Sequence, residues 1–270
     1  MTSQAQRLNA LLELVADRGS VSNAEIAEEL GISEATTRRY LQLLADQRML
    51  TRTRGGATAL GSGFEWPLQF RADRQTDQKL RIAEAALEFV SIGDSVGLNG
   101  GTTTIEIARA LGRSTRLGAD ASEPGVTVVT NALNIGYELS VRSGVRVVVT
   151  GGVARRQSFE LIGSLVDSAL ASLTLDLAIL GVDGIDPRFG VTTVHDFEAH
   201  VSTRMRRAAK RVMVVADSTK LGRVAFARVC ALDEIDILVT DAPPTGDIAA
   251  ALTAAQVEVV VADGRAVDRA

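Results

Sequence analysis

Five polar turns, rich in glycine, threonine and asparagine, each follow a short apolar run in the larger, C-terminal part of the chain. They have the sequences Asn99-Gly100-Gly101-Thr102-Thr103-Thr104, Thr130-Asn131, Thr150-Gly151-Gly152, Gly181-Val182-Asp183-Gly184 and Ala216-Asp217-Ser218-Thr219-Lys220. Glycine lets backbone amides approach a ligand closely, while threonine and asparagine place donors at helix N-termini, whose dipoles favour anions. Lys79 and Lys220, two of only three lysines, add compact cations. This chemistry suits a phosphate carried on a polyol.

Each of these turns taken singly is explained equally well as an ordinary turn that leads into a capped helix. Their positions favour a shared site, because β-branched apolar runs alternate with helical patterns from residue 77 to residue 260. That alternation predicts an α/β domain with a Rossmann-like, mainly parallel sheet. Ligands bind such sheets at the carboxyl ends of the strands, which is where the five turns fall.

A different pattern near the N-terminus predicts two short helices joined by a glycine turn. Ser22 and Glu25 have the spacing of a capping box, Gly31 stops the helix that they open, and Ser33 is placed to cap the next one. This arrangement matches the geometry of a helix-turn-helix.

The second of these helices is expected to present a polar face to DNA, because Thr37, Leu41 and Leu44 form its buried stripe. After it, the segment from Met49 to Ala57 predicts a β-hairpin wing whose turn is Gly55-Gly56. The residues expected to contact DNA are Ser33, Ala35, Thr36, Arg38, Arg39, Gln42, Arg52 and Arg54.

Charge supports this interpretation locally and not globally. The whole chain has a net charge of −4, from 29 Lys and Arg against 33 Asp and Glu. Between Arg38 and Arg54 the balance reverses, with five arginines and only Asp46 opposing them. Charge alone is equally consistent with a solvated face. Combined with the caps, the spacing and the hairpin, it favours a phosphate-contacting surface.

These motifs resemble those of the DeoR family of bacterial transcription regulators. The segment from Ser33 to Leu41 is similar to the family signature S-x-x-T-I/V-R-R-D-L, and the segment from Arg52 to Ala57 is similar to R-x-H-G-G-A. Thr37, Tyr40 and Arg54 replace the usual apolar residue, aspartate and histidine. The departures leave the predicted fold intact and make the operator sequence harder to predict.

The resemblance continues through the second domain, and it implies a sensor similar to sugar-phosphate isomerases that binds a phosphorylated sugar or related metabolite. On this resemblance, the glycine-threonine turn holds the phosphate, Thr130 and Asn131 line the site, and Asp217, Lys220 and Lys79 contact sugar oxygens. Asn99 stands where the family often has aspartate, and Ser202 where lysine is common. The implied effector-binding residues are Lys79, Asn99, Gly100, Gly101, Thr102, Thr103, Thr104, Thr130, Asn131, Gly151, Gly152, Asp183, Glu198, Asp217 and Lys220.

The length of 270 residues and the apolar content of 46% predict two domains of unequal size. We expect a winged helix-turn-helix domain at residues 1–57, a linker at 58–75 with Trp66 as a packing anchor, and an effector-sensing domain at 76–262. The sequence has no secretion signal and no apolar run of about 18 residues, so a cytoplasmic protein is expected.

No metal and no cofactor is expected. The single Cys230 excludes a disulfide framework and a cysteine zinc cluster. His195 and His200 are spaced so that they do not share one face of a helix, which disfavours a metal pair.

Two function classes remain open from the sequence. The favoured one is a repressor of carbohydrate-metabolism genes that a phosphorylated sugar releases from its double-stranded DNA operator, acting as a homodimer or homotetramer. The alternative is a sugar-phosphate isomerase-like enzyme with an appended DNA-binding head, in which Asp183, Glu198 or Asp217 moves a proton. Sensing is favoured because a DNA-binding head makes ligand turnover unnecessary.

Overall fold

The computed structural model describes residues 4–47, 49–60, 75–118 and 123–262. The chain divides into two compact units between Arg74 and Gln75. Most of the predicted linker at 58–75, with Trp66, lies outside the described residues, so its limits stay a prediction. Each unit is described separately below.

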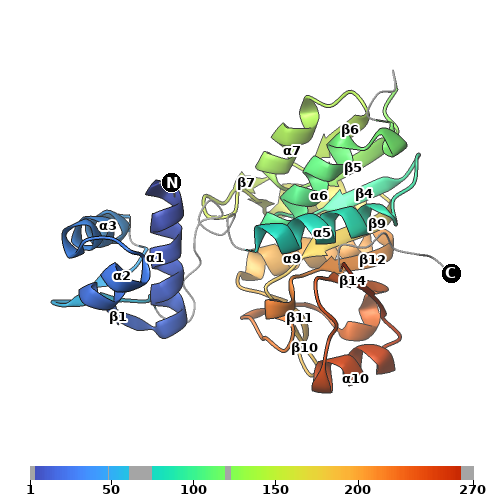
Figure 1. The fold of residues 1–270 in the computed structure, drawn as a ribbon. Coiled ribbons are helices and arrows are strands. Elements are labelled where there is room, and N and C mark those ends of the chain that lie inside the picture. The colour runs from blue at the N-terminus through green and yellow to red at the C-terminus, as the bar shows by residue number, and fades with distance from the viewer. Residues whose placement is uncertain (1–3, 48, 61–74, 119–122, 263–270) are drawn as a thin grey trace. The chain divides into compact units, whose positions relative to one another are not determined.

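The first unit packs three helices against a small antiparallel sheet with the strand order β1-β3-β2 (Figure 1). Its elements are α1 (Gln4–Arg18), β1 (Ser20–Ser22), α2 (Asn23–Glu29), α3 (Glu34–Asp46), β2 (Thr51–Arg52) and β3 (Gly56–Thr58). Leu11, Leu12, Ile26, Leu41 and Leu44 are completely buried in its core. Burial of one stripe of each helix leaves the opposite face of α3 to solvent. The predicted winged helix-turn-helix is confirmed.

Side-chain caps fix the N-terminus of α2 and the N-terminus of α3. Ser22 Oγ accepts a hydrogen bond from the Glu25 amide at 3.2 Å, and Glu25 Oε2 accepts one from the Ser22 amide at 2.8 Å. Ser33 Oγ accepts the Thr36 amide at 3.2 Å. The capping box and the second cap therefore form as predicted, each satisfying amides that a helix start leaves without partners.

The turn of the wing differs by one residue from the prediction. Arg52 pairs with Ala57 in the β2–β3 hairpin, and the Thr53 amide donates to the Gly56 carbonyl at 3.0 Å. The chain therefore reverses at Arg54-Gly55, and the predicted Gly55-Gly56 turn is wrong.

Gly56 belongs to β3, where it permits close strand packing and does not form the turn. It pairs with Ser22 of β1, and a Cβ at this position would lie 2.0 Å from the Val21 carbonyl oxygen. Only glycine permits this approach of the two backbones. A glycine required for close packing has the same sequence signature as a turn glycine, which explains the error.

The second unit is built on a seven-stranded, entirely parallel sheet with the strand order β15-β14-β12-β9-β4-β5-β6. Its strands are β4 (Ser95–Leu98), β5 (Val126–Thr130), β6 (Val145–Val149), β9 (Leu175–Gly181), β12 (Ala209–Val215), β14 (Ile237–Thr240) and β15 (Glu258–Val261). Its α-helices are α5 (Thr76–Leu87), α6 (Thr102–Arg113), α7 (Leu133–Ser140), α8 (Ser164–Ala171), α9 (Asp196–Arg207) and α10 (Gly246–Ala254). The predicted parallel α/β domain is confirmed.

Helices cover both faces of this sheet (Figure 1). Buried residues of α5, α6 and α7 form one apolar core with alternate strand residues, and those of α8, α9 and α10 form a second core with the others. Strands buried on both faces explain the nearly continuous apolar runs in the sequence. Among the described residues, no helix is long and apolar enough to cross a membrane.

The order of strands along the chain reverses between β4 and β9. From β4 the chain moves outward through β5 to β6, whereas from β9 it moves the other way through β12 and β14 to β15. Neighbouring strands whose connections leave in opposite directions create a crevice at their carboxyl ends, the usual ligand site of such sheets. Here the two strand ends lead into Asn99 and Val182.

Short antiparallel pieces flank the carboxyl edge of the sheet, and the sequence did not predict them. One pair is β7 (Val153–Ala154) with β8 (Leu161–Ile162). Another group is β10 (Gly184–Asp186), β11 (Gly190–Thr193) and β13 (Ala227–Cys230). Strands of two to four residues are too short to show an alternating pattern.

Candidate DNA-binding surface and effector site

The outer face of α3 carries the residues predicted to contact DNA. Ala35, Arg38, Arg39 and Gln42 are exposed on α3, Thr36 is partly buried, and Arg52 and Arg54 are exposed on the wing. Ser33 caps the helix and is therefore fixed at its N-terminus. The predicted set forms one surface made of the recognition helix and its wing.

Hydrogen bonds connect the wing to the recognition helix. Arg52 Nη1 donates to Gln42 Oε1, and Gln42 Nε2 donates to Asp46 Oδ1 at 2.7 Å. On the same surface Arg38 lies 2.6 Å from Glu34. Exposed pairs of this kind contribute little to stability. The contact of these side chains with DNA stays a prediction.

The crevice between β4 and β9 is closed at its base by Asn99. Its Nδ2 donates to the Gly181 carbonyl at 2.9 Å and to Ser202 Oγ at 3.1 Å, while its Oδ1 accepts the Gly181 amide at 2.8 Å. The side chain is 4% exposed. Asn99 therefore joins both strand ends to α9 and acts as part of the scaffold. The two departures from the family pattern in the second domain, Asn99 and Ser202, are hydrogen-bonded to one another.

The start of α6 follows directly and has the geometry of an anion site. Gly101 is its N-cap residue and provides no side-chain cap for the first turn, which consists of Thr102, Thr103 and Thr104. Amides of an uncapped first turn and the helix dipole both favour a negative group. The opposite strand is close, because a Cβ at Gly181 would lie 3.2 Å from Thr104 Cγ2.

Thr130 and Asn131 at the end of β5 have different tasks. The Thr130 hydroxyl donates to the Leu98 carbonyl at 2.7 Å and accepts the Ala132 amide at 3.0 Å, so its oxygen is engaged in fixing the turn. Asn131 is completely buried, and its Nδ2 donates to Glu160 Oε2 at 3.1 Å. Asn131 therefore faces another polar side chain at the edge of the sheet.

Glu160 and Arg155, both absent from the predicted set, lie in the segment that joins β7 to β8. Glu160 is 3% exposed and lies against Gly100. Arg155 Nη1 lies 2.8 Å from Oε1 of Glu198 on α9, with both side chains largely buried. The sequence contained one signal for Glu160, namely a single carboxylate inside the apolar run Phe159 to Ile162.

Asp183, Asp217 and Lys220 occupy the loops after β9 and β12. Lys220 Nζ lies 4.0 Å from Asp183 Oδ1, and the other Asp183 oxygen accepts the Thr193 hydroxyl at 2.8 Å. Asp217 Oδ1 accepts the Thr219 amide at 3.1 Å. Because β9 and β12 are neighbours, the structure brings these predicted residues to the same edge as the crevice.

The other predicted residues lie on neighbouring elements. Gly151 and Gly152 follow β6 with φ values of +75° and +129°, and a Cβ at Gly152 would lie 2.8 Å from the Ile162 carbonyl oxygen. They therefore allow the chain to fold back toward β8. Lys79 is buried in the first turn of α5. Their contact with a ligand stays a prediction.

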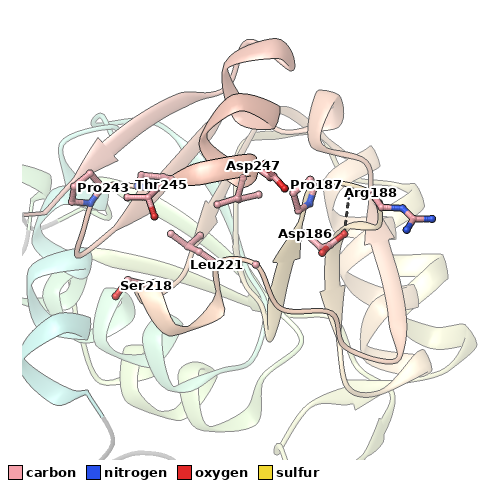
Figure 2. A pocket seen from close by; sticks show the side chains of 11 residues that line it. Asp186, Pro187, Arg188, Ser218, Leu221, Pro243, Thr245 and Asp247 are labelled. Atoms are coloured by element: carbon pink, nitrogen blue, oxygen red, sulfur yellow. Dashed lines mark hydrogen bonds between the residues drawn. The ribbon is translucent and has the colours of Figure 1, made fainter.

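A pocket of about 520 Å³ lies farther along the same edge of the sheet. Figure 2 shows it between the β10–β11 turn with Asp186 and Arg188, the loop with Ser218 and Leu221, and the start of α10. Of these, Asp186 is engaged in its own turn, since its Oδ1 accepts the amides of Arg188 and Phe189. None of the predicted effector residues lines this pocket.

The two histidines have separate environments. His195 is the N-cap residue of α9 and accepts the Phe197 amide, whereas His200 Nε2 lies 2.8 Å from Asp167 of α8. Within the described ranges, no group of three His, Cys, Asp or Glu side chains has an arrangement that would hold a metal ion.

Comparison with known families matches both units. A DeoR-like helix-turn-helix domain matches residues 7–62, and a DeoR C terminal sensor domain matches residues 74–242. The chain belongs to the DeoR family. The resemblance inferred from the recognition helix and the wing is thereby confirmed, and the second unit is the DeoR sensor domain.

Relatives in the DeoR family are similar along almost their whole length. The glycerol-3-phosphate regulon repressor of Escherichia coli is 32% identical, over 93% of this chain and 96% of the repressor. The HTH-type transcriptional regulator GlpR of Haloferax volcanii is 34% identical, over 95% of this chain and 97% of that protein. Among solved structures, a D-ribose-5-phosphate isomerase in complex with phospho-erythronic acid is 18% identical with a TM-score of 0.40, over 54% of each chain.

Proposed function

We propose that this chain is a cytoplasmic transcriptional repressor of carbohydrate-metabolism genes whose binding to operator DNA is relieved by a phosphorylated sugar. The observation that carries the proposal is the set of polar turns along the carboxyl edge of the sheet in a DeoR sensor domain, in a chain that also presents exposed arginines on its recognition helix and wing. A related repressor is named for the glycerol-3-phosphate regulon, which supports a phosphorylated effector.

In this proposal the DNA-binding residues have two roles. Ala35, Thr36 and Arg39 on α3 approach base edges in the major groove, because the N-terminal half of a recognition helix enters it, and Gln42 follows on the same exposed face. Arg52 and Arg54 on the wing, with Arg38, contact phosphates, which gives affinity without sequence preference.

The proposed effector-binding residues also have distinct roles, which follow from their chemistry. The amides and hydroxyls of Gly101, Thr102, Thr103 and Thr104 at the start of α6 receive the phosphate. Lys220, held near Asp183, is a mobile cation that moves from the carboxylate to an effector oxygen when the site fills. The remaining set contributes to the walls of the site, namely Lys79, Asn99, Gly100, Thr130, Asn131, Gly151, Gly152, Glu198 and Asp217.

Helix α9 is the element through which an effector would change the sensor. Ser202 bonds to Asn99 at the crevice, and one turn earlier Glu198 holds Arg155 of the β7–β8 segment. A ligand that binds one arrangement of these loops more tightly than another shifts their populations, and α9 moves with them.

The protein acts as a homodimer or homotetramer in this proposal. One winged head has few base contacts, so a single head binds DNA weakly, and repeated half-sites read by a symmetric oligomer supply the missing affinity. In an oligomer, effector binding can also change the spacing between two DNA-binding heads.

The isomerase alternative loses support from the relatives, which are transcriptional repressors and regulators and not enzymes. The three carboxylates proposed for it are engaged in protein contacts, Glu198 with Arg155, Asp183 with Thr193 and Asp217 with Thr219.

The test is DNA binding by the full chain to the region upstream of its own gene, titrated with a panel of phosphorylated sugars. Release by one sugar phosphate supports the proposal and names the effector class. Arg39→Ala is expected to weaken specific DNA binding and leave effector binding intact, and Lys220→Ala is expected to weaken effector binding and leave DNA binding intact. Absence of salt-sensitive DNA binding, or loss of both activities in either folded variant, would refute the proposal.

A further inference from the structure

A buried carboxylate lies directly against the loop that begins the proposed phosphate site. A Cβ at Gly100 would lie 2.3 Å from both Cγ and Oε1 of Glu160, so the glutamate side chain occupies the space that any other residue at 100 would fill. Glu160 is 3% exposed. Buried carboxylates are held by hydrogen bonds or ion pairs, and such groups cluster at functional sites.

Asn131 beside it presents an acceptor that lacks a hydrogen bond. Its Nδ2 donates to Glu160 Oε2 at 3.1 Å and to the Leu161 carbonyl at 3.2 Å. Its Oδ1 is buried and has no hydrogen-bond partner among the described residues. A buried acceptor without a partner costs about 1–3 kcal/mol, and a ligand that donates to it recovers this energy.

Backbone hydrogen bonds hold the two side chains in register. The Leu161 amide donates to the Asn131 carbonyl at 2.6 Å, and the Leu133 amide donates to the Phe159 carbonyl at 3.0 Å. Glu160 itself forms an isolated β-bridge with Ala132. The arrangement is therefore fixed by the fold of the β7–β8 segment against the end of β5, as a preorganised binding group requires.

The charge of this pair decides which part of a ligand it accepts. A carboxylate repels a phosphate, whereas it accepts hydrogen bonds from hydroxyl or ammonium groups. The neighbouring start of α6 has the opposite preference. A ligand with a phosphate at one end and donors at the other fits both.

We infer that Glu160 and Asn131 form the end of the effector site that reads hydrogen-bond donors, and that Glu160 determines specificity for a phosphorylated ligand bearing hydroxyl or amino groups. This inference rests on the proposed function of the site. It assigns a role to Glu160, which is not among the effector-binding residues predicted from the sequence.

The test compares Glu160→Gln with the wild-type full chain by isothermal titration. Glutamine keeps the size of the side chain and an acceptor for Asn131 while it removes the charge. The probes are ribose 5-phosphate, glycerol 3-phosphate, glucosamine 6-phosphate and inorganic phosphate, the last measured by competition. The matched control is Glu258→Gln, the same change at an exposed residue of β15, which lies at an outer edge of the sheet.

We expect the dissociation constant of the best-bound sugar phosphate to rise about tenfold in Glu160→Gln, while that of inorganic phosphate stays the same or falls. If Glu160 had only a structural role, Glu160→Gln would lower the affinity for both ligands by the same factor, and that result would overturn the inference. So would an unchanged sugar-phosphate affinity. If the wild type binds none of the sugar phosphates, the proposed function itself fails, which is a distinguishable outcome.

Gly100→Ala provides an independent second variant, because its Cβ displaces the Glu160 carboxylate without altering any polar group. It is expected to weaken binding of the sugar phosphate about tenfold or more and to leave the affinity for inorganic phosphate unchanged. Gly112→Ala, near the C-terminal end of α6, is the control, since the contact nearest to its Cβ is the Arg142 side chain at 3.1 Å. Equal effects of the two alanine variants would contradict the inference.

Discussion

Replacing Gly56 by alanine is expected to disable DNA binding, although residue 56 itself is buried and touches no DNA in the proposed complex. The added Cβ would lie 2.0 Å from the Val21 carbonyl oxygen, 2.7 Å from Ser22 Cα and 2.9 Å from the Val21 carbonyl carbon. All three atoms belong to the backbone of β1, so no side chain can rotate away. Strands β1 and β3 must therefore separate by about 1 Å or more to restore ordinary contact.

The energetic cost follows from what holds these strands together. Overpacking of a well-packed site costs about 1–3 kcal/mol. The shift also strains the hydrogen bond from the Asn23 amide to the Gly55 carbonyl, 2.7 Å long, and the ladder in which Ser22 pairs with Gly56. Each backbone hydrogen bond lost adds about 1 kcal/mol. The sum of about 3–5 kcal/mol is most of the stability of a domain of this size.

Gly55→Ala is the matched control. The neighbouring glycine has no heavy atom within 4 Å of its Cβ position, and its φ is not positive. In the full chain, Gly56→Ala should lower operator affinity more than about tenfold, and Gly55→Ala should stay within about twofold of the wild type. Fluorescence anisotropy measures the DNA affinity, and effector titration verifies that the sensor remains folded in both variants. Equal DNA affinity in the two variants would refute the reasoning.

Three further outcomes are expected. Arg39→Ala should weaken operator binding about tenfold and leave the effector affinity unchanged, and fluorescence anisotropy at several salt concentrations measures the operator affinity. An unchanged operator affinity would show that Arg39 does not contact DNA. Arg155→Met should lower the free energy of unfolding by about 3–5 kcal/mol because the buried Glu198 carboxylate loses its ion pair with Arg155, and the double variant with Glu198→Gln should recover part of this loss in denaturant titrations. The hydrogen bond from Lys210, with those from Ser95, lowers the pKa of Asp176 far below its ordinary value. The ionised Asp176 carboxylate therefore contributes its full stabilisation above about pH 4, and this stabilisation is lost as the pH falls toward the folded-state pKa. Asp176→Asn should therefore lower the melting temperature at pH 7, and the difference from the wild type should shrink in acid.

Local signals account for what the sequence predicted well. The capping box of Ser22 and Glu25, the cap at Ser33 and the buried stripe of α3 each depend on residues within one or two turns of one another. Such patterns predict local structure without knowledge of the rest of the fold. The same holds for the turns after the buried strands, since a parallel sheet brings all carboxyl ends to one edge.

The missing parts depend on contacts between distant segments. Arg155 meets Glu198 across 43 positions of the sequence, and Glu160 meets Asn131 across 29. The strands that position Arg155 and Glu160 are two residues long and show no period. Gly56 illustrates the same limit, because its partner is the backbone of β1 and a backbone carries no sequence signal.

The pairing of β4 with β9 also sets the order in which a newly synthesised chain folds. Its register joins Val96 to Leu177, whereas the wing joins Arg52 to Ala57. Closing the longer loop costs more entropy and must wait until the later strand has left the ribosome, while the head folds from local contacts that are already present. A product that ends before Leu175 therefore carries the DNA-reading head but lacks β9, and with it the crevice between β4 and β9 through which a metabolite would control the head.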